Sequence, residues 1–229
     1  MQLIIRDLIY RSPLEQLLDY INSLGWLQTS TICQLHNPCK ANISCSHRSQ
    51  TVIIDFDHIK DLHCKGQEPL ASVDAIYKNE ELLFIEIKGW KKYLEYHLHD
   101  ISQKDIKEQI TKYKLEKKLQ DSLSILDILV SKANISDPHL FKSLPKQYII
   151  VTDISTENDP LEKFAENLTF LATFSSGLNL WDATKEQIER FPSSRFSEYN
   201  ISGPFLVYCK DFDRFILQKK TTPTGVGAV

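Results

Sequence analysis

The chain has 229 residues, of which 42% are hydrophobic and 25% are charged, and its formal net charge is −3. This acidic balance excludes a strong overall attraction to nucleic acid, so any such partner must be met by a local basic patch. No apolar run reaches 18 residues and the first residues lack a signal-peptide layout, which predicts a cytoplasmic protein without a membrane partner. The odd count of five cysteines argues against a disulfide framework.

One domain is expected, because a chain of this length can bury a good hydrophobic core. Residues 1–218 are predicted to form it, and residues 219–229, which carry Thr, Gly and Pro without any periodic pattern, to form a flexible tail.

A helix is predicted to begin at Pro13. Ser12 suits the N-cap, Pro13 suits the first helical turn, and Glu15 completes a capping box. Leucine and isoleucine then recur at helical spacing until Gly25, which predicts where the helix ends.

An irregular stretch follows, rich in potential metal ligands. Their order is Cys-x2-His-x2-Cys-x5-Cys-x-His, comprising Cys33, His36, Cys39, Cys45 and His47. Such donors can form a tetrahedral zinc site, but the paired Cys-x-x-Cys knuckles of strong zinc motifs are absent. A polar loop, or strands joined by one, with reduced buried thiols is the favoured interpretation.

Residues 51–56 predict a strand, and the polar residues after it predict a loop that carries His58, His63 and Cys64. Asp57 is either an extra acid near a site or a turn residue, and the second interpretation is favoured.

Two apolar runs around a polar turn, residues 74–88, predict a central hairpin. In the second run, Glu86 and Lys88 share one strand face because side chains alternate along a strand. Both faces of this run are apolar, which is typical of a covered central strand. Burying a carboxylate and an ammonium there is costly unless they bind something.

The loop length decides whether Asp74 joins them. A two-residue turn places Asp74 and Glu86 on opposite faces of the hairpin. A loop of three or five residues places Asp74 directly opposite Glu86, with Lys88 on the same side. A shared site therefore requires an odd loop or a bulge around residues 78–81.

The hairpin carries the pattern Val73-Asp74, then eleven residues, then Glu86-Ile87-Lys88. This pattern resembles the motif of the PD-(D/E)xK, or restriction-endonuclease-like, nuclease superfamily, in which Pro is usual at the position of Val73. The resemblance implies an α/β (α+β) fold with a central mixed β-sheet flanked by helices. It implies that Asp74 and Glu86 bind Mg²⁺ or Mn²⁺, with the carbonyl of Ile87 and the carboxylate of Glu15 as further ligands. Lys88 then orients the attacking water or stabilises the transition state.

A long helical stretch, residues 102–130 with one break, follows the hairpin. Residues 88–120 hold nine lysines against five acidic residues, the only basic concentration in the chain. Gln109 and Tyr113 lie one helical turn apart and resemble the Q-x-x-x-Y motif of RecB-like members, which implies contact with the DNA backbone. Lys91 and Lys92 are also expected near the substrate.

The remaining chain predicts a parallel crossover followed by shorter elements. We expect a buried strand at 146–153, helices at 160–174 and 183–191, a short strand or turn at 178–181, a strand at 204–209 and an edge element at 212–217.

The resemblance therefore implies a metal-dependent nuclease, with DNA as the favoured substrate, of the kind found in bacterial restriction, repair or defence systems. The chain contains neither a helicase motif nor a P-loop, so a homodimer, or a subunit beside a separate motor or recognition protein, is expected. A ribonuclease, a catalytically silent binding or assembly module of the same fold, and a zinc-binding regulatory domain remain as alternatives.

Overall fold

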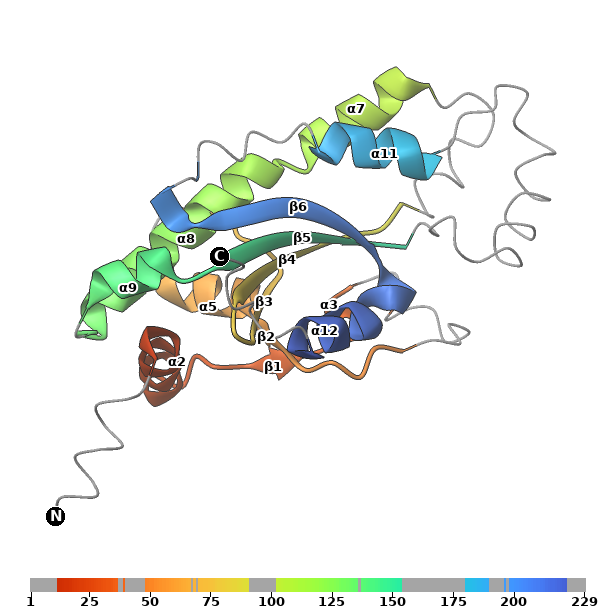
Figure 1. Ribbon diagram of the computed structural model, residues 1–229. Helices are drawn as coiled ribbons and strands as arrows, with labels where there is room; N and C mark the ends of the chain where they lie inside the picture. The colour runs from red at the N-terminus through yellow and green to blue at the C-terminus, as the bar shows by residue number, and fades with distance from the viewer. Residues whose placement is uncertain are drawn as a thin grey trace, which may run out of the picture.

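The computed structural model describes residues 12–36, 39, 48–66, 68, 70–90, 102–135, 137–153, 180–189, 196 and 198–221. Within these ranges the fold is mixed α/β, with a six-stranded sheet between helices (Figure 1). The helix expected at 160–174 lies outside the described residues, as do Lys91 and Lys92.

The six strands lie in the sheet in the order in which they occur in the chain. They are β1 (Thr29–Ser30), β2 (Ile53–Asp55), β3 (Ala75–Lys78), β4 (Leu82–Lys88), β5 (Lys146–Thr152) and β6 (Ile201–Tyr208). Strands β1 to β4 pair antiparallel, whereas β5 is parallel to β4 and β6 is parallel to β5. The sheet is therefore mixed, and the expected parallel crossover between β4 and β5 is confirmed.

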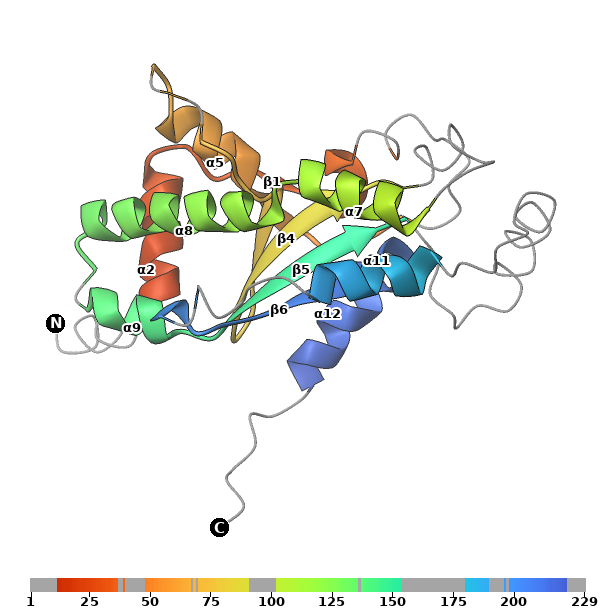
Figure 2. The ribbon, with the colours of Figure 1, turned by 90° about the horizontal axis from the view of Figure 1, so that it is seen from above.

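Helices cover both faces of the sheet. They are α2 (Pro13–Ser23), α3 (Ile32–Leu35), α5 (Phe56–His63), α7 (Gln103–Lys112), α8 (Leu115–Lys132), α9 (Pro138–Ser143), α11 (Leu180–Glu189) and α12 (Phe212–Thr221), with a 3₁₀ turn η2 (Cys209–Asp211) before the last. One core packs α2, α5, α8 and α9 against the sheet, and a second core packs α3 and α12 against its other face. Figure 2 shows α7 and α8 end to end on the first face, with α11 beside α7.

The helix predicted to begin at Pro13, with a capping box, is confirmed as α2. Ser12 Oγ accepts a hydrogen bond from Glu15 N at 3.2 Å, and Glu15 Oε2 accepts one from Ser12 N at 3.1 Å. The expected break in the long helical stretch is also confirmed. It lies at Tyr113 and Lys114, where Lys114 adopts the left-handed conformation with φ of 51°.

Several expectations were wrong. Cys33 lies in α3 and not in a polar loop, because Thr31 Oγ1 accepts a hydrogen bond from Gln34 N and caps this short helix. Leu180 and Trp181, expected in a short strand or turn, begin α11.

The residues after β2 form α5 instead of a polar loop, because the Asp55 carboxylate accepts a hydrogen bond from His58 N at 3.0 Å and caps a helix that buries Phe56 and Ile59. The residues expected as an edge element form α12, whose buried Phe212 and Ile216 are spaced four apart. Helix α12 extends to Thr221, so residues 219–221 are not part of a tail.

No helix in the described ranges is both long enough and apolar enough to cross a bilayer.

Candidate active site

The hairpin of β3 and β4 brings Asp74 and Glu86 together. Ala75 lies opposite Ile85 and Lys78 opposite Leu82, which leaves a three-residue loop at 79–81. This is the odd loop that a shared site requires, and it places Asp74, directly before β3, across from Glu86.

Hydrogen bonds fix the Asp74 carboxylate beside β4. Its Oδ2 accepts a hydrogen bond from Ile87 N at 2.6 Å. The preceding residue is anchored to α8, since Val73 N donates to Ser122 Oγ at 3.0 Å. Neighbouring elements thus hold the carboxylate in place, while 18% of the Asp74 side chain remains exposed.

Glu86 is fully buried, with 0% of its side chain exposed, and two lysines reach its carboxylate. Lys88 Nζ contacts Glu86 Oε1 and lies 4.0 Å from Asp74 Oδ2. Lys118 Nζ, from α8, lies 2.6 Å from Glu86 Oε1 and 3.5 Å from Asp74 Oδ1. The fold therefore gathers two acids and two lysines in one cluster, and Lys118 is the member that the sequence pattern did not single out.

Burial and, after it, the neighbouring charge of Asp74 raise the pKa of Glu86 to about 7, against the opposing effect of Lys88 and Lys118. The charges of Glu86 and Asp74 raise the pKa of Lys118 although burial acts in the other direction. The acid pair is thus costly to ionise in the absence of a further cation.

The stability of the metal-free protein is expected to fall as the pH rises from about 5 to about 7.5. Unfolded Glu86 loses its proton near its ordinary pKa, whereas folded Glu86 keeps it until about pH 7, so the native state binds more protons in this window. Denaturant unfolding with a chelator present should show a decline of about 2 to 3 kcal/mol that Glu86→Gln lacks. Parallel pH profiles for the two proteins would contradict this assignment.

The donor set fits a hard divalent cation that takes part of its shell from water and phosphate. Among the described residues, no three His, Cys, Asp or Glu side chains gather closely enough to enclose a metal ion. Mg²⁺, however, is usually held by one or two carboxylates together with waters and substrate oxygens. Glu86 Oε2 is buried and has no hydrogen-bond partner, so the cluster offers an oxygen that a cation would satisfy.

Glu15 does not lie in this cluster. Its Oε1 accepts from Lys78 Nζ at 2.7 Å, and the charge and hydrogen bonds of this partnership lower the pKa of Glu15. Lys78 ends β3 at the hairpin loop, four residues from Asp74, which is about 13 Å along a strand. The structure therefore assigns Glu15 to helix capping and an ion pair, and the expectation that it is a metal ligand is wrong for this arrangement.

Gln109 and Tyr113 do lie beside Lys88. The Lys88 ammonium sits 5.3 Å from the centre of the Tyr113 ring, and Trp90 packs edge-on against the same ring at 5.7 Å. Gln109 Nε2 donates a hydrogen bond to Tyr113 Oη at 3.4 Å. The last turn and C-cap of α7 thus place an amide and an aromatic ring beside Lys88, next to the acid cluster.

Lys118 is the functional candidate that the sequence interpretation missed, whereas Asp57 was considered as an extra acid near a site and set aside as a turn residue. Asp57, in the first turn of α5, accepts a hydrogen bond from Ser72 Oγ, and burial together with Asp74 raises the pKa of Asp57. Lys118 lies three and four residues from Leu115 and Ser122, which are both buried. A lysine on the apolar face of a helix was the available signal for it.

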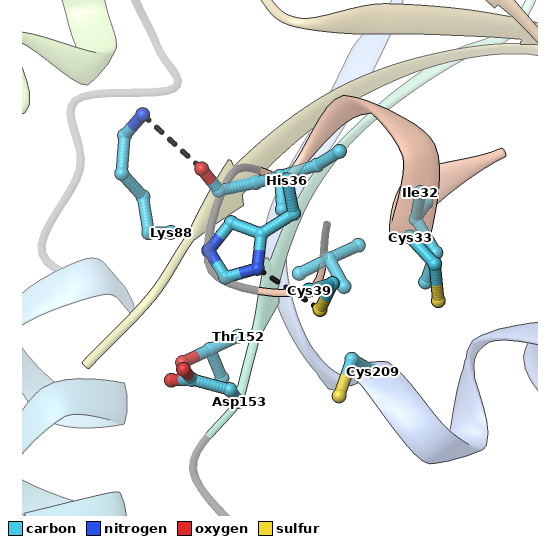
Figure 3. Close-up of a pocket in the computed structure, with 10 residues that line it drawn as sticks. Ile32, Cys33, His36, Cys39, Lys88, Thr152, Asp153 and Cys209 are labelled. Atoms are coloured by element: carbon cyan, nitrogen blue, oxygen red, sulfur yellow. Dashed lines mark hydrogen bonds between the residues drawn. The ribbon is translucent and has the colours of Figure 1, made fainter. Parts of the chain in front are cut away.

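A second feature, a small pocket, adjoins the cluster where β4 and β5 end (Figure 3). It is lined by Ile32, Cys33, His36, Cys39, Ile87, Lys88, Val151, Thr152, Asp153 and Cys209. His36 Nδ1 lies 3.2 Å from Cys39 Sγ, and burial lowers the pKa of His36. Three of the five residues considered for a zinc site, Cys33, His36 and Cys39, thus line one pocket. The other two, Cys45 and His47, lie outside the described residues.

The backbone at Gly89, directly after β4, passes close to two side chains that line this pocket. A Cβ at this position would lie 2.6 Å from His36 Nε2 and 3.3 Å from Asp153 Oδ2. Asp153 is itself fixed, since its Oδ1 accepts from Trp90 N at 2.5 Å.

Gly89→Ala is therefore expected to destabilise the protein by about 1 to 3 kcal/mol, the usual cost of overpacking. In the double variant Gly89→Ala, His36→Ala, the lost imidazole makes room for the methyl group, so the Gly89→Ala cost should shrink by at least half in denaturant unfolding. Equal costs in the two backgrounds would show that the imidazole is not the obstacle.

Comparisons of the sequence with protein-family models and of the chain with curated proteins and solved structures give no significant match. Function must therefore be inferred from the side chains that the fold brings together.

Proposed function

We propose that the protein is a metal-dependent nuclease that hydrolyses phosphodiester bonds, with DNA as the favoured substrate. The observation that carries the proposal is the convergence of Asp74, Glu86 and Lys88 on one end of the β3–β4 hairpin. The mixed sheet, with an antiparallel hairpin followed by a helical crossover to a parallel strand, supports a restriction-endonuclease-like core.

The carboxylates of Asp74 and Glu86 and the main-chain carbonyl of Ile87 would hold the divalent cation. Bound there, the cation would supply a Lewis acid that lowers the pKa of water and offsets the negative charge of the phosphate. Glu86 must be ionised to bind it, so cation binding is expected to strengthen as the pH rises through about 7.

Lys88 is the residue proposed to act on the reacting phosphate. Its ammonium lies at the C-terminal end of β4, with 16% of its side chain accessible and its Nζ 3.3 Å from Ile87 O. A positive charge at this point stabilises the negative charge that develops on the phosphoryl oxygens in the transition state. Tyr113 and Gln109 flank Lys88 and are proposed to position the strand being cut.

The exposed lysines of α7 and early α8 support a nucleic-acid substrate. Exposed lysines follow α7 and the start of α8, which carries Lys118 into the acid cluster; they are Lys104, Lys107, Lys112, Lys114 and Lys117. Lysines along one surface next to a site neutralise phosphates and release counterions.

The test is a cleavage assay on linear and circular double-stranded DNA, single-stranded DNA and RNA, with Mg²⁺, with Mn²⁺ or with a chelator. Wild-type protein is compared with Asp74→Asn and with Glu80→Gln, an exposed acid in the loop of the same hairpin. We expect metal-dependent cutting by wild type and Glu80→Gln, and none by Asp74→Asn.

Three results would count against the proposal in different ways. Equal cutting by all three proteins would identify a contaminating nuclease. Preferential cutting of RNA would favour the ribonuclease alternative. Binding of nucleic acid without cutting under any metal condition would favour a silent binding module.

A further inference from the structure

Lys118 occupies the centre of the acid cluster although it comes from a separate helix. Its Nζ bridges the two carboxylates, at 2.6 Å from Glu86 Oε1 and 3.5 Å from Asp74 Oδ1. Its side chain is largely buried, with 21% exposed, so this contact is shielded from water. The helix is fixed at this point, because Ser122 Oγ, one turn further, donates to Lys118 O at 2.7 Å and accepts from Val73 N.

This position overlaps the one proposed for a divalent cation. Metal–oxygen distances in Mg²⁺ and Ca²⁺ sites are about 2.0 to 2.6 Å, so a cation held by both carboxylates lies where the Lys118 ammonium now lies. A cation that takes the unpartnered Oε2 of Glu86 still shares the two carboxylates with the Lys118 ammonium on Oε1, and the repulsion between the two positive groups is weakly screened in a buried site. The flexible four-carbon stem of lysine allows its ammonium to swing away while the helix stays in place.

We propose that Lys118 is a built-in counter-ion, which holds Asp74 and Glu86 together in the metal-free protein and is displaced when a divalent cation binds. The inference rests on the proposed function, since it concerns the same acids. In this role Lys118 is a positioning residue: it preserves the geometry of two like charges that otherwise repel, and it lowers the affinity for the cation by competing with it. Lys88 also contacts Glu86 Oε1, but it lies further from Asp74 and at the strand end, where it can remain beside the phosphate.

The test is calorimetric titration of Mn²⁺ alone into wild type, Lys118→Met and Lys118→Gln at pH 8, without nucleic acid. Both variants are expected to bind Mn²⁺ about 10- to 100-fold more tightly, because the cation no longer has to break a charge-assisted hydrogen bond. Lys118→Gln keeps a donor for Glu86 and guards against loss of folding in the methionine variant. Lys117→Met is the matched control, since Lys117 is the exposed neighbour that pairs with Asp121, and it should change the affinity less than about threefold.

A second readout is thermal unfolding with and without Mn²⁺. Without metal, Lys118→Met is expected to unfold at a lower temperature than wild type, because two buried acids lose a counter-ion. Saturating Mn²⁺ should remove most of that difference. Wild-type protein that cleaves and binds Mn²⁺ while both Lys118 variants bind it no more tightly would overturn the counter-ion role and leave the nuclease proposal standing. Wild-type protein that neither binds Mn²⁺ nor cleaves would overturn both.

Discussion

Replacement of Glu86 by glutamine is expected to lower the rate of metal-dependent phosphodiester cleavage by about 10³-fold, the upper end of the range for loss of one electrostatic group in a site. The amide keeps the size of the side chain but removes the charge from the fully buried member of the acid pair. The measurement is the cleavage rate at saturating DNA and Mn²⁺, together with Mn²⁺ affinity. A variant that retains wild-type activity would remove Glu86 from the site.

Lys88→Met is expected to behave differently from Glu86→Gln. Its cleavage rate should fall about 10²- to 10³-fold, while its affinity for Mn²⁺ is retained or increased, because an ammonium beside the reacting phosphate acts on the transition state and not on the cation. Lys132→Met, an exposed lysine at the end of α8 that is not among the lysines proposed to meet the substrate, should retain most of the activity. Equal losses in the two lysine variants would mean that Lys88 supplies only general positive charge.

A further large effect, on stability, is expected at Lys146, which begins β5 at the end of the strand away from the acid cluster. Lys146 is 1% exposed, and the three protons of its ammonium are shared among four carbonyl oxygens near Nζ, those of Phe141 at 2.6 Å, Lys142 at 3.0 Å, Leu144 at 2.8 Å and Tyr199 at 3.1 Å. Burial lowers the pKa of Lys146 to about 8. One ammonium thus ties the end of α9 to the turn before β6.

Lys146→Met is therefore expected to destabilise the protein by about 2 to 4 kcal/mol, because several buried carbonyl groups lose their donor while the apolar stem is kept. The measurement is denaturant unfolding at pH 7. Lys132→Met, an exposed lysine at the end of α8, is the control and should change stability by less than about 0.5 kcal/mol. Equal stability of the two variants would show that water replaces the ammonium without cost.

Local signals accounted for the elements whose ends carry strong chemistry. The capping box at Ser12 and Glu15 and the apolar runs of β4 and β5 appear in the structure where the sequence predicts them. A break in the long helical stretch was also predicted, but its position at Tyr113 and Lys114 came only from the structure. The expectations that were wrong concern α5 and α12. Both are short amphipathic helices whose apolar residues become recognisable only when the sheet that they cover is known.

The motif residues Asp74, Glu86 and Lys88 could be identified before the fold was known, because side-chain alternation along a strand is a local property of the backbone. The same alternation showed that Asp74 and Glu86 lie on one face of the hairpin only if the loop between the two strands has an odd number of residues or a bulge. Three features became known only from the folded chain. The hairpin loop has three residues, α8 brings Lys118 to the two acids, and Glu15 pairs with Lys78 at the far end of β3. Contacts between elements distant in the chain depend on how whole layers pack, and no local pattern of residues encodes that packing.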